Sequence, residues 1–261
     1  MDRASQDAAA HLVEIFASPQ GEGPWVGTPT VFVRFDGCDL RCAWCDSPQT
    51  WVRGGSCRIE QAPGAAVFDT TDNPVSIDRV DEALATLASR GHGFVSLTGG
   101  EPLLQPGAAR AVATRARARG LRVYLETHGL ATEALASVID VVDVVSMDWK
   151  LAGEVSPAPG ASREPFVERH EAFLSLAAQQ SEVFVKLVLT GKTSDDDLDS
   201  MCEALERTGV KPLLVLQPVT PVGKGAVPAS TERILAAQRR CAERVGDVRV
   251  IPQTHRAYGA L

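Results

Sequence analysis

The sequence of residues 37–47 is Gly37-Cys38-Asp39-Leu40-Arg41-Cys42-Ala43-Trp44-Cys45-Asp46-Ser47. It follows the apolar, β-branched run over residues 30–34, which predicts a strand, so the cysteines fall in the loop at its C-terminal end. Their spacing is C-x3-C-x2-C, and three thiolates this close in the chain can converge on one soft metal centre. A cubane cluster has four irons, so three cysteines leave one iron open to a substrate or cofactor. The stretch therefore predicts an iron–sulfur cluster.

Two other uses of these cysteines stay open at this point. A structural zinc site usually takes four ligands in two pairs, and no second C-x2-C pair or spaced histidine pair follows in the sequence. A disulfide beside a free thiol would fit an oxidising compartment, but residues 1–6 lack the apolar segment of a secretory signal. Both alternatives are weaker than the iron–sulfur cluster.

The composition is that of a globular chain with a substantial core. Of its 261 residues, 44% are hydrophobic and 23% are charged, and the formal net charge is −7. This acidic balance argues against a general nucleic-acid binder, which usually carries a basic stripe. No apolar run approaches the ~20 residues of a membrane span. We therefore expect a cytoplasmic protein with no nucleic-acid or membrane partner.

Strands and helices alternate along most of the chain. This alternation predicts an α/β fold with a parallel sheet and right-handed crossovers. Six strand–helix units are too few for an eight-stranded barrel, so we expect a partial, open (β/α)6-type barrel in a single domain over residues 1–261. The predicted strands cover residues 30–34, 94–97, 122–125, 141–146, 182–189 and 212–216, and the predicted helices cover residues 76–90, 105–119, 132–139, 166–179, 194–208 and 230–245.

Two segments lie outside this alternation. Residues 1–11 predict a disordered tail. Residues 53–75 contain several glycines and prolines with little periodicity, which indicates an irregular insertion with at most a short hairpin. Cys57 in this insertion is either a fourth thiol near the cluster or a packed residue. Cys202 and Cys241 fall in helical patterns and are most simply small buried apolar residues.

A glycine-rich turn, Thr98-Gly99-Gly100-Glu101-Pro102, follows the second barrel strand. Glycines let the backbone approach a ligand closely, with N–H and C=O groups free to pair with a polar amino-acid moiety. Alone, such a turn is as typical of a helix entry as of a ligand site. Parallel sheets place their sites at the C-terminal ends of the strands, so we expect this turn and the cysteine loop at the same end of the barrel.

The cysteine loop and the Gly99-Gly100 turn together resemble the radical S-adenosylmethionine (SAM) superfamily. In that superfamily, three cysteines hold a 4Fe–4S cluster, and the amino and carboxylate groups of SAM chelate its unique iron. One electron from the cluster cleaves the sulfonium and yields a 5′-deoxyadenosyl radical. The resemblance implies a partial barrel with the cluster loop after its first strand.

Further motifs narrow the resemblance. From Glu14 to its end, the chain is similar to the 7-carboxy-7-deazaguanine synthase family. This implies a carbon–nitrogen lyase that converts 6-carboxy-5,6,7,8-tetrahydropterin to 7-carboxy-7-deazaguanine and ammonia, with SAM regenerated and Mg²⁺ assisting. It also implies a homodimer and an electron donor such as flavodoxin or ferredoxin. The motifs are Glu14-Ile15-Phe16, Gln20-Gly21-Glu22-Gly23-Pro24, Phe32-Val33-Arg34, Cys45-Asp46-Ser47 and Gln253-Thr254-His255.

The resemblance assigns roles residue by residue. Cys38, Cys42 and Cys45 would ligate the cluster, and Ser47, where the family usually has threonine, would ligate Mg²⁺ through its retained hydroxyl. The residues implied to contact SAM are Gly100, Ser146, Met147, Asp148, Gln217, Pro218, Val219 and Thr220. Those implied to contact the pterin are Pro19, Gln20, Gly21, Arg34, Thr98 and the terminal carboxylate of Leu261, with Arg34 and Thr98 as catalytic residues.

Some alternatives remain. Arg34 can meet a substrate carboxylate with its planar fork, or it can form a structural salt bridge with Asp36 or Asp46. A glycyl-radical-enzyme activase shares the C-x3-C-x2-C loop, and a non-catalytic metal-binding module is the third hypothesis. The motif over residues 20–24 and the tail over residues 253–261 favour a small pterin site. Three residues at strand ends are open between a site role and a structural role: Glu126, His128 and Lys150.

Overall fold

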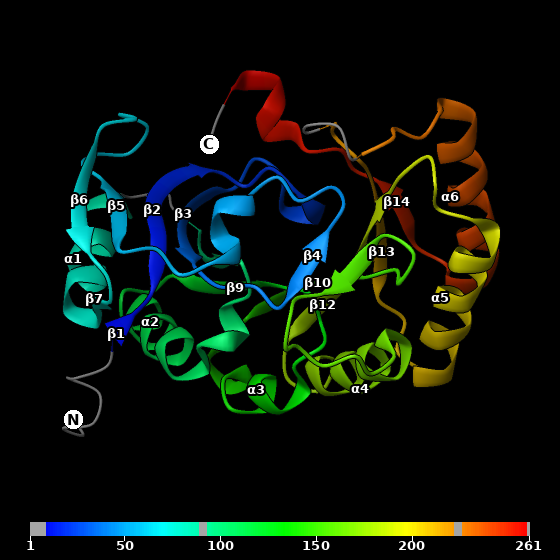
Figure 1. The fold of residues 1–261 in the computed structure, drawn as a ribbon, viewed down its shortest axis with the longest axis horizontal. Coiled ribbons are helices and arrows are strands. Elements are labelled where there is room, and N and C mark those ends of the chain that lie inside the picture. The colour runs from blue at the N-terminus through cyan, green and yellow to red at the C-terminus, as the bar shows by residue number, and fades with distance from the viewer. Residues whose placement is uncertain (1–8, 89–92, 222–225, 260–261) are drawn as a thin grey trace.

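The computed structural model describes residues 9–88, 93–221 and 226–259. Its main feature is a ten-stranded mixed sheet that curls into an open barrel, with the helices on its outer face (Figure 1). The strands lie in the order β14-β13-β12-β10-β9-β8-β3-β2-β5-β6. Their bounds are β2 (Leu12–Pro19), β3 (Pro29–Phe35), β5 (Ser56–Glu60), β6 (Phe68–Asp72), β8 (Phe94–Gly99), β9 (Arg122–Thr127), β10 (Val144–Trp149), β12 (Glu182–Leu189), β13 (Leu213–Pro218) and β14 (Val248–Val250).

Two small sheets, six α-helices and five short 3-10 helices complete the described elements. One small sheet pairs β1 (Ala9–Ala10) with β7 (Val75–Ser76), and the other pairs β4 (Leu40–Cys42) with β11 (Val155–Pro157). The helices are α1 (Ile77–Leu87), α2 (Pro106–Ala118), α3 (Thr132–Ala136), α4 (Phe166–Ala177), α5 (Asp195–Thr208) and α6 (Thr231–Val245).

The central strands of the large sheet are parallel. Each pair from β3 through β8, β9, β10, β12 and β13 to β14 runs in the same direction, and a helix follows each of the first six of these strands. β2 runs antiparallel to β3 and parallel to β5. The predicted partial barrel of six strand–helix units is therefore confirmed.

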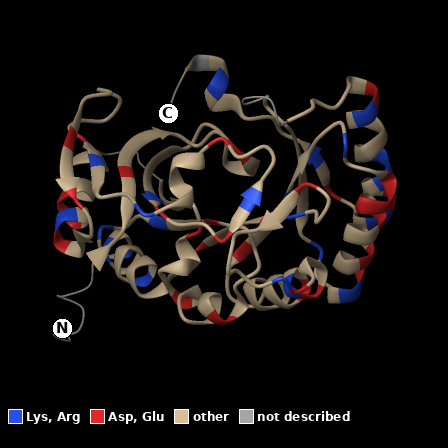
Figure 2. Cartoon of the chain, in the orientation of Figure 1, with Lys and Arg blue, Asp and Glu red and all other residues tan. Residues whose placement is uncertain are grey.

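Local sequence explains where the helices begin. Ser76 caps α1 by accepting a hydrogen bond from the backbone N–H of Arg79. Ser194 and Asp197 form a reciprocal capping box at the start of α5, so the acidic run there has a helix-end role. Figure 2 shows acidic and basic residues at many positions along α5 and α6. Several are ion pairs between these helices, such as Arg240 with Asp199 at 2.5 Å.

Aromatic side chains fill the barrel at the N-terminal ends of its strands. Phe94, Tyr124 and Phe184 form a buried cluster, against which Trp25 packs with its ring 5.3 Å from that of Phe94. The guanidinium of Arg122 lies over the rings of both Trp25 and Phe94. The interior of the barrel is therefore packed at this end, and the pocket that the loop cysteines line opens at the C-terminal ends of the strands.

The structure differs from the sequence-based expectation in several places, including the helix predicted over residues 132–139, which ends at Ala136. The predicted disordered tail over residues 1–11 includes β1, while residues 1–8 lie outside the described part. The insertion predicted over residues 53–75 contains the short hairpin that the sequence allowed, β5–β6, but this hairpin extends the main sheet beside β2, which was not predicted. The strand predicted over residues 141–146 begins at Val144, because Ile139–Val141 forms a 3-10 turn.

The three cysteines outside the loop pack in the hydrophobic core. Cys57, Cys202 and Cys241 are at most 1% exposed, and Cys57 points into the core from β5. Cys57 is therefore a packed residue and does not face the cysteine loop pocket. Among the described residues, no helix has the length and apolar character needed to cross a membrane.

Candidate active site

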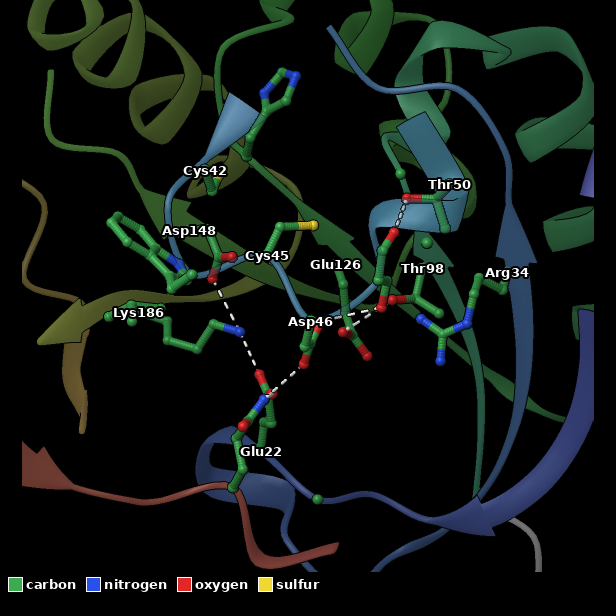
Figure 3. Close-up of a pocket in the computed structure, with 18 of the residues that line it drawn as sticks. Glu22, Arg34, Cys42, Cys45, Asp46, Thr50, Thr98, Glu126, Asp148 and Lys186 are labelled. Carbon is green, nitrogen blue, oxygen red and sulfur yellow. Dashed lines mark hydrogen bonds and ion pairs between the residues drawn. The ribbon is translucent and has the colours of Figure 1, made fainter. Parts of the chain in front are cut away.

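A pocket opens at the C-terminal ends of the barrel strands, where the sequence predicted the site. Side chains enter it from β2, β3, β8, β9, β10, β12 and β13, from the cysteine loop and from the C-terminal segment (Figure 3). Elements far apart in the chain therefore share one cavity. The same pocket is lined by all three loop cysteines and by Arg34 and Thr98.

The cysteine loop presents three free thiols to this pocket. Cys38, Cys42 and Cys45 are all partly exposed. The backbone of the loop is fixed, because Cys42 pairs with Val155 of β11 and the Arg41 guanidinium donates to the carbonyl oxygen of Cys38 at 2.9 Å. Burial raises the pKa of Cys38 to about 12 and also raises that of Cys42. Burial therefore favours the protonated thiols of Cys38 and Cys42, and a bound metal would displace their protons.

The glycine-rich turn packs directly against the start of the cysteine loop. Gly99 has φ +121°, and a Cβ on Gly100 would lie 2.1 Å from the carbonyl oxygen of Gly37, so no side chain fits there. The Gly100 N–H donates to the Phe35 carbonyl at 3.0 Å, and the Glu101 N–H donates to the Gly37 carbonyl at 2.9 Å. The two predicted motifs thus form one continuous wall of the pocket.

His128 joins these two motifs. Its Nε2 lies 2.9 Å from Asp39 Oδ1 and 3.3 Å from Glu101 Oε2, and its backbone N–H donates to the same Glu101 oxygen. Burial alone would lower the pKa of His128, but the carboxylates of Glu101 and Asp39 outweigh burial and raise it. His128 lines the pocket and also connects the cysteine loop to the glycine-rich turn, so it has both the site position and the structural role that the sequence left open.

Arg34 reaches the pocket from β3. Its Nε donates to Glu14 Oε1 at 2.9 Å, so its structural partner is Glu14 and neither of the predicted alternatives, Asp36 and Asp46. Figure 3 shows the guanidinium pointing into the cavity near Thr98. Within the described residues, no hydrogen bond occupies its two terminal nitrogens, which are free to pair with an anionic ligand.

Glu126 lies at the centre of a hydrogen-bonded group on the same side of the pocket. Ser96 and Gln20 donate to its Oε1 at 2.7 and 3.2 Å, and Thr98 donates to its Oε2 at 3.1 Å. Burial, followed by the nearby charge of Glu22, raises the pKa of Glu126. The predicted residues Gln20 and Thr98 thus hold a half-buried carboxyl group that can accept hydrogen bonds from a ligand's N–H groups.

A chain of charged side chains crosses the opposite side. Lys186 forms ion pairs with Glu22 and with Asp148 Oδ1, the latter at 3.0 Å, and Asp148 Oδ2 also pairs with Lys150 at 2.9 Å. Glu22 Oε1 accepts from Gln253 of the C-terminal segment at 2.7 Å. Sequence reasoning missed Lys186, although a single lysine within the apolar strand β12 is a recognisable signal of a buried partner.

The residues predicted to contact SAM divide into two groups. Gly100, Asp148, Gln217, Val219 and Thr220 line the pocket. Gln217 is buried, and its Oε1 has no hydrogen-bond partner among the described residues, so a polar ligand would satisfy it. The lining does not include Ser146, Met147 or Pro218, and the side chain of Met147 packs in the core, so any contact from Met147 would come from its backbone.

The remaining predicted positions lie around the mouth of the pocket. Pro19, Gln20 and Gly21 line it, and Gly21 fits closely against the ring of His255. Ser47 also lines it, and its hydroxyl donates to Asp46 Oδ1 at 3.0 Å. Leu261, whose terminal carboxylate was predicted to contact the pterin, lies outside the described residues.

Several known proteins resemble this chain. The Radical SAM superfamily model matches residues 32–205. The chain is 38% identical to the 7-carboxy-7-deazaguanine synthase of Geobacter sulfurreducens over 258 residues, which cover 97% of this chain and 98% of the relative. It is 37% identical to the 7-carboxy-7-deazaguanine synthase of Methanopyrus kandleri over 250 residues, which cover 94% and 92% of the two chains.

Solved structures share the fold. QueE from Escherichia coli matches with a TM-score of 0.61 at 19% identity, over 94% of this chain and 93% of that one. A radical SAM methyltransferase from Sphaerobacter thermophilus also matches with a TM-score of 0.61, at 16% identity, over 86% of this chain and 66% of that one. By the superfamily match and the full-length relatives, this chain belongs to the radical SAM superfamily and, within it, to the 7-carboxy-7-deazaguanine synthase family.

Proposed function

We propose that this chain converts 6-carboxy-5,6,7,8-tetrahydropterin to 7-carboxy-7-deazaguanine with loss of ammonia. One observation carries the proposal: a single pocket contains both the three free thiols and an arginine whose terminal nitrogens have no protein partner among the described residues. The thiols suit the radical chemistry of the superfamily, and the arginine suits the carboxylate of this substrate. The full-length similarity to two synthases of this name supports the same reaction.

Membership of the radical SAM superfamily implies a 4Fe–4S cluster and SAM. The residues fit both groups, because three free thiols line one cavity and the buried Gln217 Oε1 in its wall lacks a partner. Cys38, Cys42 and Cys45 would hold the cluster. SAM would lie against Gly100, Gln217, Val219 and Thr220 and near Asp148, with Ser146, Met147 and Pro218 limited to the periphery. Together, the bound groups supply one-electron cleavage of a sulfonium and a radical that abstracts hydrogen from the substrate.

The other side of the cavity would bind and orient the pterin. Arg34 would pair with the substrate carboxylate through its planar fork. Glu126, held by Thr98 and Gln20, would accept hydrogen bonds from the amino and N–H groups of the pterin ring. Pro19 and Gly21, which line the mouth of the pocket, would cover the ring edge. Arg34 and Thr98 are therefore the residues that set the reacting carbon in place.

Anaerobic turnover tests the proposal. The reconstituted protein, given a chemical reductant, SAM and carboxytetrahydropterin, should form a product with the ultraviolet chromophore of a deazapurine and release ammonia. SAM cleavage without that chromophore would contradict the specific reaction and point to another radical SAM reaction, such as activation of a glycyl-radical enzyme. A protein that takes up no cluster would be a non-catalytic module.

Ser47 is the proposed protein ligand of Mg²⁺. Its hydroxyl lies beside the carboxylate of Asp46, so two hard oxygen donors face the pocket together. We expect Ser47→Ala to lose the stimulation of turnover by Mg²⁺ while keeping its cluster absorption, measured by titrating Mg²⁺ into anaerobic assays. Ser56→Ala, at an exposed serine of β5, is the control. An unchanged Mg²⁺ response in Ser47→Ala would remove this residue from the metal site.

We also propose that a small reducing protein such as flavodoxin or ferredoxin supplies the electron and that the chain acts as a homodimer. Light scattering on the purified protein tests the second point, because a monomer at micromolar concentration would contradict it.

A further inference from the structure

Arg34 belongs to a row of three charged side chains that crosses three neighbouring strands. Glu14 on β2 is in register with Arg34 on β3 and with Arg58 on β5. Arg34 Nε lies 2.9 Å from Glu14 Oε1, and an Arg58 terminal nitrogen lies 2.5 Å from Glu14 Oε2. Each carboxylate oxygen of Glu14 is therefore occupied by a different arginine.

The row runs from the pocket to the outside of the sheet. The side chain of Glu14 is 8% exposed, that of Arg34 is 17% exposed and that of Arg58 is 54% exposed. The Arg58 guanidinium also lies 4.7 Å from the centre of the Phe68 ring on β6, which helps to fix its direction. The hairpin β5–β6 thus supplies both the outer charge of the row and the ring that supports it.

This arrangement decides how Arg34 can bind Glu14. An arginine and a carboxylate prefer a bidentate pair, in which two guanidinium nitrogens meet two oxygens. Because Arg58 already occupies Oε2, Arg34 keeps only the contact through Nε, and its terminal nitrogens point into the pocket (Figure 3). Without Arg58, both oxygens of Glu14 would be available, and Arg34 could turn a terminal nitrogen towards Glu14 and away from the cavity.

We propose that Arg58 is a positioning residue that keeps the terminal nitrogens of Arg34 available to the carboxylate of the substrate. Arg58 also adds a second positive charge to the row, so the single negative charge of Glu14 is shared between two arginines and does not fully neutralise Arg34. The proposal rests on the proposed function, because it takes the ligand of Arg34 to be the carboxylate of the pterin. It gives the β5–β6 hairpin a role in substrate recognition from outside the pocket.

Steady-state kinetics of Arg58→Met test the proposal. We expect KM for carboxytetrahydropterin to rise by about three- to tenfold with little change in kcat, because a partly exposed ion pair is worth only a modest free energy. Arg58→Lys, which keeps the charge, should recover part of the loss. Arg53→Met is the matched control, since Arg53 is an exposed arginine just before the hairpin and outside the row, and its KM should stay at the wild-type value.

A ligand without the carboxylate separates positioning from general damage to the fold. Tetrahydropterin, used as a competitive inhibitor, should bind Arg58→Met and the wild type equally, because Arg34 has no carboxylate to meet. Equal weakening of both ligands would overturn the proposal in favour of a structural role. An unchanged KM for the carboxylated substrate would also overturn it.

A double substitution tests whether Arg58 acts through Glu14. In a Glu14→Gln background, adding Arg58→Met should leave KM unchanged, since the carboxylate that links the two arginines is already gone. A further rise in KM would contradict the mechanism. If the wild-type enzyme forms no deazapurine from the carboxylated pterin, the proposed function fails and this inference falls with it. If the wild type turns over and Arg58→Met matches it, only the inference fails.

Discussion

Replacing Cys42 by alanine is expected to abolish cluster binding and turnover together. Cys42 lies on β4, paired with Val155, so the small alanine side chain should leave the loop in place. The loss of turnover should exceed about a hundredfold, the upper end of what removing an outer partner of a metal ligand costs, because here a ligand itself is lost. Anaerobic reconstitution followed by visible absorption and a turnover assay would measure both effects.

Cys202→Ala is the control for this experiment. Cys202 is 1% exposed on α5, remote from the pocket, so its removal should cost some stability and leave the cluster absorption unchanged. If Cys42→Ala kept both the visible absorption and the turnover of the wild type, the assignment of the cysteine loop as the cluster site would be wrong. If both variants lost the cluster, the effect would reflect damage to the fold.

Replacing Lys186 by methionine is expected to cause the largest loss of stability. The side chain of Lys186 is 7% exposed and neutralises Glu22 and Asp148, which are themselves only 17% and 23% exposed. Removing one partner of a buried ion pair costs about 3–5 kcal/mol, because the other charges remain buried without compensation. At about 2–4 °C per kcal/mol for a chain near this size, the midpoint of thermal unfolding should fall by about 6–20 °C. Thermal denaturation at neutral pH measures it.

The pH dependence separates lost charge from lost packing. Burial alone would raise the pKa of Asp148, but Lys150 and Lys186 outweigh burial and lower it. A lowered carboxyl pKa contributes stability that is present above its ordinary value of 3.8 and is lost as the pH falls through the lowered value. The deficit of Lys186→Met should therefore be largest near neutral pH and should shrink below about pH 4. The control, Lys211→Met at an exposed lysine, should have the unfolding midpoint of the wild type at every pH. If Lys186→Met also had the wild-type midpoint at every pH, the prediction would be wrong.

The place of the hairpin β5–β6 in the main sheet illustrates what the sequence could not reveal. Cys57 and Ile59 of β5 are buried while Ser56 and Arg58 are exposed, so the strand does have a two-residue period. The alternating segment is only five residues long, so its pattern does not stand out from the irregular, glycine- and proline-rich sequence around it. What stabilises the hairpin is its pairing with β2, a contact between segments about forty residues apart.

In the candidate site too, the local motifs could be predicted from the sequence, whereas contacts between strands could not. The cysteine spacing, the Gly99-Gly100 turn and the order of strands and helices are local patterns, and the structure places the two motifs side by side as expected. The sequence interpretation named the wrong ion-pair partners for Arg34. It considered Asp36 and Asp46, which are close to Arg34 in the chain, whereas the observed partner, Glu14, lies opposite Arg34 on the neighbouring strand β2. Which residue lies opposite another depends on strand register, and register is set by the packing of the whole sheet.

Local sequence patterns suffice to predict a partial α/β barrel with a three-cysteine loop and a glycine-rich turn at one end. Backbone periodicity and ligand spacing are patterns among residues close together in the chain, so they can be recognised in the amino-acid sequence. The ion pairs of Lys186 with Glu22 and Asp148, and the sharing of Glu14 by Arg58 and Arg34, become visible once the strands are placed side by side. Lys186 and Glu22 are 164 residues apart in the chain. Burying an unpaired charge costs a large free energy, so buried charged side chains pair with opposite charges on neighbouring strands, however far apart they are in the sequence.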